Sequence, residues 1–512
     1  MPAALVWLKR DLRLHDHAAL AAACACEQAL ALYVIEPVWL RSPEFDPQHL
    51  QFALACVAAL RARGLPLVVR VGDLPQVLQA LQAEYPFTQL FSHEETGPLW
   101  TWDRDRAVAA WCRQAGVAWQ EFPQTGVVRR LRQRSGWAGR WAARMNTPQA
   151  PGPAGLAGVA GLALEPLPDL PSLGLAPTAR PLPAAGEAAA QAVLDGFLQQ
   201  RGADYRRTLS SPLTAEQGCS RLSPHLAFGT LSMRQLHQAT EARICTLSQG
   251  GPEERRFAHA LRGFAGRLRW HCHFMQKLED EPQIEHRNFA RSCDGLREDD
   301  FDATRFAAWC EGATGYPMVD ACMRSLCATG WLNFRMRAML VSFAAYHLWL
   351  HWREPGLFLA RQFLDFEPGI HWSQMQMQSG TTGINTLRMY SPIKQAQDHD
   401  PQGLFIRRWL PELGGVPLAN LAAPWTMSPA EQRASGCVIG RDYPAPIVDH
   451  ATALRQARDR LYALRGSAAA RHEADAIQQR HGSRRSGLPP SGGRTRRTAA
   501  AASAQATLFG DA

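Results

Sequence analysis

Long apolar segments are missing from this sequence. No run free of charges and proline approaches the roughly 20 residues that a helix needs to cross a bilayer. The short apolar stretch near the N-terminus runs directly into Lys9, Arg10 and Asp11, where a secretory signal would need its hydrophobic region. These absences argue against membrane-embedded and secreted classes and predict a soluble, cytoplasmic protein.

The cysteine spacings of metal centres are missing as well. The chain has 12 cysteines, but one residue separates Cys24 from Cys26 and four separate Cys322 from Cys327, without the paired pattern of zinc or iron–sulfur sites. The run His271, Cys272, His273 does not replace them, because successive helical residues point about 100° apart and cannot all ligate one ion. We therefore predict reduced thiols and no metal.

Apolar material is abundant. The chain has 512 residues, of which 46% are hydrophobic, with 16 tryptophans, so it exceeds the usual size of one domain. Two domains are the default expectation. The formal net charge of +9 suits a polyanionic partner without proving one.

The N-terminal part reads as an α/β domain. Apolar runs at 5–8, 29–35, 66–71 and 89–92 are typical of buried strands, and they alternate with helical patterns such as 50–60 and 74–81. This alternation predicts a doubly wound parallel sheet flanked by helices over residues 1–131.

The rest of the chain divides into a linker, a helical domain and a tail. Residues 132–190 are predicted to be an interdomain linker, rich in proline and glycine in the later part. Its glycines have neither the spacing nor the preceding strand of a dinucleotide-binding fingerprint. From 191 to 465 the periodicity is helical, which predicts a large all-α domain.

The tail, residues 466–512, is rich in Ala, Ser, Gly and Arg. Its seven arginines and three acidic residues contribute +4 of the net charge of +9. It has almost no large apolar residues with which to build a core, so we predict a disordered basic tail. Both a plain solvated tail and a nonspecific nucleic-acid contact fit this composition.

Charged residues within the apolar segment 330–383 are the strongest indication of a site. Arg335, Arg337 and Asp365 lie among tryptophans, glutamines and methionines in helix-patterned sequence. A buried charge is costly unless it meets an opposite charge or a polar ligand. Arg337 and Asp365 therefore predict an ion pair held around a ligand.

A second candidate site precedes an apolar helix. Gly218, Cys219, Ser220 and Ser223 come just before it, and Pro224 falls in its first turn. Free backbone N–H groups and hydroxyls at such a position suit a phosphate. Ordinary N-capping explains the same residues.

Four segments together resemble the photolyase/cryptochrome family. They are LVWLKRDLRLHDHAAL (5–20), CSRLSPHLAFGTLS (219–232), EGATGYPMVDACMRSL (311–326) and the region 330–383, in the order of the family. The resemblance implies an antenna domain followed by an all-helical catalytic domain that encloses FAD.

It also implies a set of FAD contacts, with Arg337 and Asp365 beside the isoalloxazine ring. His371 falls where repair enzymes of the family place an asparagine beside flavin N5, and Tyr205 lies two residues further from the phosphate loop than in the family. The implied cofactor-binding residues are Tyr205, Cys219, Ser220, Arg221, Leu222, Ser223, Phe264, Arg337, Asp365, Phe366, Glu367 and His371.

The implied partner is DNA that contains pyrimidine dimers. Trp270 and Arg335 fall where the family lines the pocket for a flipped dimer. The pocket methionine falls at Ala338, so Met339, one place along, is taken as its substitute. Arg267 stands where enzymes that repair cyclobutane dimers usually keep a glutamate, and SQMQMQ (373–378) lies near the second wall tryptophan.

Electron delivery to the flavin uses a file of tryptophans in this family. Trp352 matches the middle member. An ungapped comparison puts Met375 at the proximal position, and Trp372 serves there only if the loop after Asp365 is rearranged. Asp299 stands at the outer position, for which Trp349, Trp309 or Tyr346 are substitutes; core packing explains the same aromatic residues.

The first domain offers a site for an antenna pigment, folate or deazaflavin in this family. Lys9, Arg10, Asp11 and Arg13 follow the first strand, and 93–95 (His-Glu-Glu) follow the fourth, at the edge where open α/β sheets hold ligands. Structural ion pairs explain these residues equally well. Further on, the arginines within 129–134 suit either DNA phosphates or a domain interface.

The leading functional prediction is a monomeric DNA photolyase. Reduced FAD, excited by blue light, would pass an electron to a flipped pyrimidine dimer, with Trp352, Trp372, Arg337 and Asp365 as the catalytic set. The alternative is a cryptochrome-like photoreceptor that signals through flavin photoreduction without repair. A flavin oxidoreductase that works in the dark is disfavoured, because nothing resembles a nicotinamide site.

Overall fold

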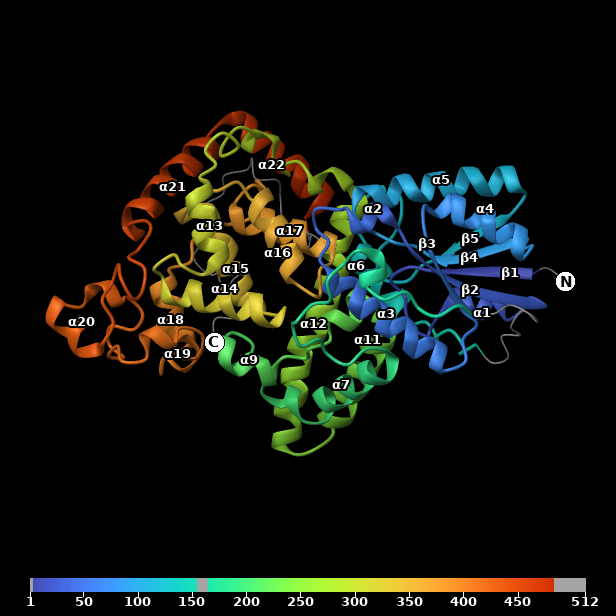
Figure 1. Cartoon of the computed structure of the whole chain (residues 1–512), viewed down its shortest axis with the longest axis horizontal. Coiled ribbons are helices and arrows are strands. Elements are labelled where there is room, and N and C mark those ends of the chain that lie inside the picture. Colours follow the sequence, from blue (N-terminus) through green and yellow to red (C-terminus); the bar gives the residue numbers. More distant parts are fainter. Residues whose placement is uncertain (1–2, 154–163, 483–512) are drawn as a thin grey trace.

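The computed structural model describes residues 3–153 and 164–482. An α/β domain forms one end of the molecule and a larger helical domain the other (Figure 1). This confirms the predicted fold class. Within the described ranges, no helix combines the length and apolar character needed to span a membrane.

The α/β domain is built on a parallel sheet with strand order β3-β2-β1-β4-β5. The strands are β1 (Ala3–Leu8), β2 (Gln28–Ile35), β3 (Leu67–Val71), β4 (Gln89–His93) and β5 (Ala118–Phe122). The predicted strands correspond to the first four. The edge strand β5 was not anticipated, because its sequence AWQEF is only partly buried and lacks an apolar run.

Alternate residues of β1 feed two separate cores. Leu5 and Trp7 pack on one face of the sheet, and Val6 and Leu8 on the other. Helices therefore cover both faces: α1 (Ala18–Ala23), α2 (Pro37–Leu40), α3 (Pro47–Ala62), α4 (Leu74–Glu84) and α5 (Leu99–Ala115). The strand order reverses beside β1, which opens a crevice at the carboxyl ends of β1 and β4.

The segment predicted as a linker contains an ordered helix. In α6 (Trp137–Met145), the residues Trp137, Trp141 and Met145 are buried against the helical domain. Their i, i+4 spacing puts all three on one face. The prediction that residues 132–190 are only a linker is therefore wrong for α6. Residues 154–163, with three of the linker glycines, lie outside the described residues.

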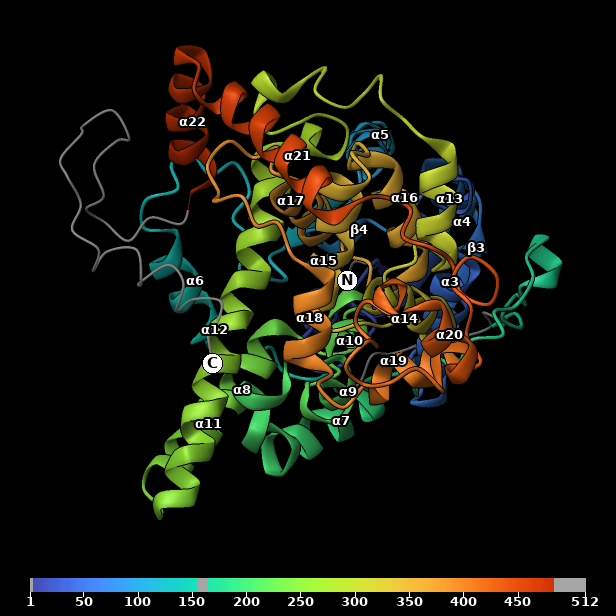
Figure 2. The same cartoon turned by 90° about the vertical axis from the view of Figure 1, so that its left-hand side faces the viewer.

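The helical domain surrounds a large core of apolar residues. The α11–α12 pair projects from it (Figure 2). Its α-helices are α7 (Glu187–Gln199), α8 (Tyr205–Thr208), α9 (Pro212–Gly218), α10 (Ser223–Ala227), α11 (Met233–Ser248), α12 (Pro252–Asp280), α13 (Ala303–Glu311), α14 (Pro317–Thr329), α15 (Phe334–Ser342), α16 (Arg353–Gln362), α17 (Pro368–Ser379), α18 (Pro392–His399), α19 (Leu404–Trp409), α20 (Pro429–Ser435), α21 (His450–Arg465) and α22 (Ala468–His481). Single turns are η1 (Pro171–Leu173), η2 (Arg201–Asp204), η3 (Pro282–Glu285), η4 (Arg291–Cys293), η6 (Pro411–Leu413) and η7 (Pro424–Thr426), and η5 (Phe343–His347) is a π-helix.

Buried polar contacts join the two domains. The backbone N–H of Leu12 donates to the carbonyl of Phe228 (3.1 Å). The carboxylate of Asp16 accepts from the hydroxyl of Ser232 (2.5 Å) and from Arg234 Nε (3.0 Å). These contacts fix the loop after β1 against the segment that carries α10.

The prediction of disorder from residue 466 is wrong for α22. Ala470, Ile477 and His481 are buried there. The His481 ring lies 5.0 Å from that of Phe289, and Glu473 accepts from the backbone N–H of Ser292 (3.0 Å). Polar contacts provide much of this docking, so apolar periodicity could not reveal it. Residues 483–512 lie outside the described residues.

Removing α22 is therefore expected to destabilise the protein. A chain ending at Arg465 loses the Ile477 contact with Ala290 and Cys293, and the N–H groups of η4 lose Glu473. We expect a loss of about 2 kcal/mol. Thermal unfolding should be compared with that of a chain ending at Gly482. Equal melting temperatures for the two truncations would show that the docking of α22 contributes nothing.

Candidate cofactor-binding site

A cavity of about 310 Å³ lies within the helical domain, where α10, α12, α15 and α17 meet. Every residue predicted to bind the cofactor lines it: Tyr205, Cys219, Ser220, Arg221, Leu222, Ser223, Phe264, Arg337, Asp365, Phe366, Glu367 and His371. They come from segments more than 150 residues apart in sequence, and the fold brings them to one cavity.

Arg337 and Asp365 form the predicted ion pair. Arg337 Nη1 donates to Asp365 Oδ1 (3.0 Å) and Nη2 donates to Oδ2 (2.9 Å), which is the bidentate geometry of strong charge-assisted pairs. Nε of Arg337 donates to the carbonyl of Leu332 (2.6 Å), and the guanidinium lies 3.9 Å from the Phe363 ring centroid. The guanidinium is therefore fixed on every side except the one that faces the cavity.

The charge of Asp365 is stable at neutral pH. Burial raises the pKa of this carboxyl, but Arg337 and a hydrogen bond from Ser223 more than offset it, so the pKa lies below its ordinary value. Arg221, whose backbone φ is +61°, adds positive potential while its guanidinium covers the Trp331 ring at 3.8 Å. The site thus combines a fixed carboxylate with two guanidiniums.

Arg201 holds the loop before α10 and was not anticipated. Its Nη1 donates to the carbonyl of Cys219 (2.7 Å) and its Nη2 to that of Ser220 (3.2 Å). With these carbonyls bound from outside, the Ser220 and Ser223 side chains line the cavity. Pro224 follows in the first turn of α10, as the sequence predicted.

His271 and Glu367 form a second ion pair in the cavity wall. Nε2 of His271 lies 2.6 Å from Oε2 of Glu367. Burial lowers the pKa of His271, but the Glu367 carboxylate, together with a hydrogen bond and electrostatic interaction with Cys272, outweighs this and raises it to about 10. The imidazole is therefore a cation at neutral pH. The residues are far apart in sequence, so no local pattern could pair them.

The His271 pair gives stability a defined pH dependence. Because the pKa is raised in the folded state, the pair stabilises fully below the unfolded pKa of about 6.5, and this contribution is lost as pH rises towards 10. His271→Gln should cost about 2 kcal/mol at pH 6 and almost nothing at pH 10. Unfolding titrations at several pH values measure this, with the exposed His259→Gln as control. A difference that does not change with pH would contradict a charged His271.

His371 is the opposite kind of histidine. Burial lowers its pKa to about 3, so the ring is neutral. Its Nε2 lies 2.9 Å from the carbonyl of Gly356, which can only accept, so Nε2 carries the proton. Nδ1 is left as an acceptor on a ring that lines the cavity.

The cavity fits a flavin chemically. Its walls are largely apolar, from Leu, Phe, Ile, Val and Met side chains, and its polar groups converge from Arg337, Asp365 and the 219–223 loop. Buried polar atoms of lining residues, among them Oδ1 of Asn333 and Nε2 of Gln374, have no hydrogen-bond partner among the described residues. A flavin edge, with both donors and acceptors, meets such atoms.

Two tryptophans lie behind the cavity wall. Trp372 is fully buried, and its ring centroid is 4.8 Å from that of His371 and 5.8 Å from that of Trp352. A Cβ on residue 356 would lie 2.6 Å from the Trp372 ring, so Gly356 is needed for this packing. Trp352 and Trp372 thus form a connected pair, whereas Met375 lines the cavity itself.

The other aromatic candidates are placed differently. Asp299 is exposed, and Trp309 is buried against Phe306 and Phe358. Trp349 donates from Nε1 to Asp300 Oδ2 (3.1 Å) in a separate cluster that also contains Tyr346. The outer member of the tryptophan file therefore stays a prediction with alternatives.

The predicted DNA contacts do not line this cavity. Trp270 and Arg335 are half-buried, and the Trp270 ring lies 5.6 Å from that of Phe274. Met339 is fully buried in the apolar core, so its prediction as a DNA contact is wrong. One step along a helix turns a side chain by about 100°, which is why Ala338 lines the cavity and Met339 does not. Arg267 also lines it.

The histidines of α12 point to different partners. His271 pairs with Glu367, whereas Nδ1 of His273 lies 2.8 Å from Arg134 Nη2. The spacing of these histidines on the helix predicted that they would point apart, and they do.

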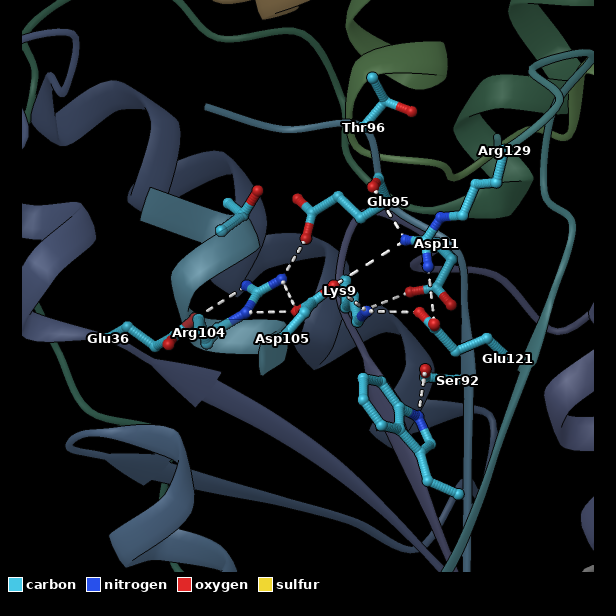
Figure 3. Close-up of polar contacts among 12 residues, drawn as sticks. Lys9, Asp11, Glu36, Ser92, Glu95, Thr96, Arg104, Asp105, Glu121 and Arg129 are labelled. Atoms are coloured by element: carbon cyan, nitrogen blue, oxygen red, sulfur yellow. Dashed lines mark hydrogen bonds and ion pairs between the residues drawn. The ribbon is translucent and has the colours of Figure 1, made fainter. Parts of the chain in front are cut away.

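The carboxyl edge of the sheet carries a closed network of charges (Figure 3). Arg104 of α5 pairs with Glu36 (3.0 Å), Glu95 (2.7 Å) and Asp105 (2.8 Å). Lys9 lies 3.4 Å from Asp105. These contacts support the interpretation of the residues after β1 and β4 as structural ion pairs.

A pigment at this edge would have to move side chains. The cavity beside the network has only about 70 Å³, although aromatic walls from Trp39 and Phe366 suit a planar ring. Pockets for ligands of this size usually hold several hundred Å³. A folate or deazaflavin at this edge therefore stays a prediction that requires these side chains to move.

Comparisons with known proteins place the chain in a family of flavoproteins. Residues 264–463 match the family model of the FAD binding domain of DNA photolyase, and residues 4–135 match the model of DNA photolyase. The deoxyribodipyrimidine photo-lyase of Halobacterium salinarum is 31% identical over 479 residues, covering 87% of this chain and 96% of that protein. The cryptochrome DASH of Gloeobacter violaceus is 28% identical over 485 residues, covering 87% and 93%. A crystal structure of a class III photolyase from Agrobacterium tumefaciens superposes with a TM-score of 0.78 at 25% identity, covering 91% and 98%.

Proposed function

Since the chain belongs to the photolyase/cryptochrome family, we propose that it is a DNA photolyase that uses blue light and reduced FAD to split pyrimidine dimers. The observation that carries this proposal is the single cavity around the Arg337–Asp365 pair, lined by every residue predicted for FAD. Relatives named as photo-lyases, matched along nearly their whole length, support it.

The residues of the cavity hold and polarise the cofactor. Bound FAD, when reduced, supplies the excited electron. The Arg337 guanidinium would face the ring with its charge fixed by Asp365, while Ser220 would offer its hydroxyl to the phosphates and Ser223 holds the Asp365 carboxylate. Neutral His371 presents an acceptor nitrogen, whereas His271 adds a positive charge near Glu367.

The substrate side of the proposal rests on Trp270 and Arg335. Both lie on helices that contribute to the cavity, α12 and α15, and in this proposal they would supply a flat wall and a basic group for a flipped dimer. Arg267 in the cavity lining adds a charge where a carboxylate would serve cyclobutane dimers. This difference makes the class of lesion the first question for experiment.

Trp372 and Trp352 are proposed to return electrons to oxidised flavin. The charged groups around the two rings favour movement of a positive charge (an electron hole) from Trp372 to Trp352, away from the cavity. The Arg353 guanidinium lies 4.5 Å from the Trp372 ring centroid and disfavours positive charge there. The indole N–H of Trp352 donates to Asn288 Oδ1 (2.7 Å), and Nδ2 of Asn288 donates to Asp294 (2.9 Å). A carboxylate behind this acceptor favours positive charge on Trp352.

Lesion loss in light tests the proposed function. Photoreduced protein is mixed with duplexes that carry one cyclobutane dimer or one (6-4) product and exposed to blue light, with dark samples as control. We expect light-dependent loss of one of the two lesions. Photoreduction without loss of either lesion would contradict repair and favour a cryptochrome-like photoreceptor.

A further inference from the structure

A fully buried arginine lies outside the cofactor cavity without a carboxylate partner. Arg297 is 1% exposed, and its Nη2 donates to the carbonyl of Ser379 (3.1 Å). Its Nε and Nη1 have no acceptor within the described ranges, and no carboxylate of these ranges lies within ion-pairing distance. An uncompensated charge of this kind is costly to bury.

Neighbouring groups add to the positive potential. Arg465 is also unpaired with any carboxylate of the described residues; it donates to the carbonyls of Asn385 (2.9 Å) and Gly380 (3.3 Å). Both arginines act electrostatically on the hydroxyl of Tyr346 and lower its pKa against the effect of burial. The Tyr346 hydroxyl is buried and has no partner in the described chain. Arg297 and Tyr346 thus have three unused donor atoms between them, and the guanidinium lies 5.8 Å from the Tyr346 ring centroid.

The protein's own groups supply only part of the missing negative charge: Glu298, whose carboxylate accepts from the backbone N–H of Arg297 (2.9 Å), acts on the guanidinium from beyond ion-pairing distance. Burial raises the pKa of Tyr346 to about 12 and that of the nearby Cys293 thiol to about 11, so both are neutral. Arg297 also covers the Trp349 ring at 4.4 Å, but a ring face offsets only part of a full charge.

The local backbone and the surface provide a route to this region. Tyr346 belongs to the π-helix η5, and Trp349 has a φ of +57°, a conformation that a bulky residue rarely adopts. Both residues line an open pocket of about 250 Å³, and the Arg297 guanidinium, which does not line it, lies 5.8 Å and 4.4 Å from the centroids of their rings. A small ion can reach Arg297 by movement of these two side chains.

We propose that a small monovalent inorganic anion, such as chloride, binds between Arg297 and Tyr346. One ion accepts hydrogen bonds from Nε and Nη1 of Arg297 and from the Tyr346 hydroxyl, and it balances the charge of Arg297. A larger oxyanion is disfavoured because Tyr346 Oη is closely covered: a Cβ on residue 380 would lie 2.8 Å from it. The bound ion would fix η5 and the conformation of Trp349.

Bromide and thermal unfolding test this proposal on the full-length, flavin-loaded protein. Crystals grown in bromide should show an anomalous peak within hydrogen-bonding distance of Arg297 and Tyr346. The melting temperature should rise saturably with chloride or bromide, relative to gluconate at the same ionic strength. Tyr346→Phe should weaken the halide affinity about tenfold, since one charge-assisted hydrogen bond is lost.

Two substitutions of buried arginines serve as a matched pair. Arg297→Met should abolish the halide dependence, whereas Arg134→Met, which removes a buried arginine that is already paired with Asp280 (3.0 Å), should keep it. If Arg297→Met does not fold, the wild-type bromide peak and the Tyr346→Phe titration decide the question. Equal melting temperatures in chloride and gluconate, no bromide peak, or stabilisation by sulfate but not chloride would overturn the proposal.

Discussion

Replacing Asp365 with asparagine is expected to remove most of the flavin from the purified protein. The substitution keeps the shape but leaves the Arg337 guanidinium without its bidentate partner. Breaking a buried pair costs about 3 to 5 kcal/mol, and because the Arg337 side chain is 24% exposed we expect the lower end of this range or less. FAD affinity should fall about 100-fold. Flavin released by heat and measured per chain gives the result.

An exposed pair provides the control for Asp365→Asn. Asp398 pairs with Lys394 (3.0 Å) on the surface of α18, and Asp398→Asn should retain wild-type flavin. The pKa of Asp365 is lower in the folded wild-type protein than in the unfolded chain. The pair therefore stabilises the fold fully at pH values above the unfolded pKa of about 3.9, and this stabilisation is lost only as the pH falls below that value. Full flavin content in Asp365→Asn would contradict the role given to the pair.

Trp352→Phe should slow the photoreduction of oxidised flavin by a factor of about ten or more. Phenylalanine keeps an aromatic ring beside Trp372 but is much harder to oxidise, and it lacks the N–H bonded to Asn288. Among the described residues, the other ring neighbours of Trp372 are Phe366 and His371, which are much harder to oxidise than tryptophan, so charge returns from the flavin before Trp372 is refilled. The decay of oxidised flavin absorbance in blue light, with an external thiol as reductant, measures the rate.

Other tryptophans provide the controls for the relay. Trp372→Phe should be as slow as Trp352→Phe, whereas Trp309→Phe and Trp349→Phe report on the outer member. Repair by chemically reduced protein should be nearly unchanged in Trp352→Phe, because that step draws no electron from the tryptophans. Photoreduction at the wild-type rate in Trp352→Phe would mean that electrons take another path.

The cost of burying charge explains why the central pair was predictable from sequence. Arg337 and Asp365 lie in apolar, helix-patterned segments, where two unpaired charges would be costly to bury. An ion pair between them was therefore expected, and the structure contains this pair. The pair of His271 and Glu367 gave no such signal, because each residue also suits an exposed helix position. Their meeting depends on the packing of α12 against the segment before α17.

Periodicity identified most elements but missed those fixed by few contacts. β5 is an edge strand with one side open, and α22 docks through Ile477, His481 and Glu473 rather than through an apolar stripe. Met339 was misplaced for a different reason. On α15, Ala338 lines the cavity whereas the next residue, Met339, points into the apolar core, so an error of one position changes the predicted role. The position of Trp372 depends on where α17 begins, at Pro368. The local sequence does not predict where that helix start lies in space relative to Trp352.

Native mass spectrometry of the purified protein tests the central claim most directly. The claim is that the cavity around Arg337 and Asp365 is an FAD site. It predicts one noncovalently bound FAD per wild-type chain at this site and its loss in Asp365→Asn under the same conditions. Wild-type protein that takes up no FAD, or an Asp365→Asn protein that keeps it at the wild-type level, would contradict the account.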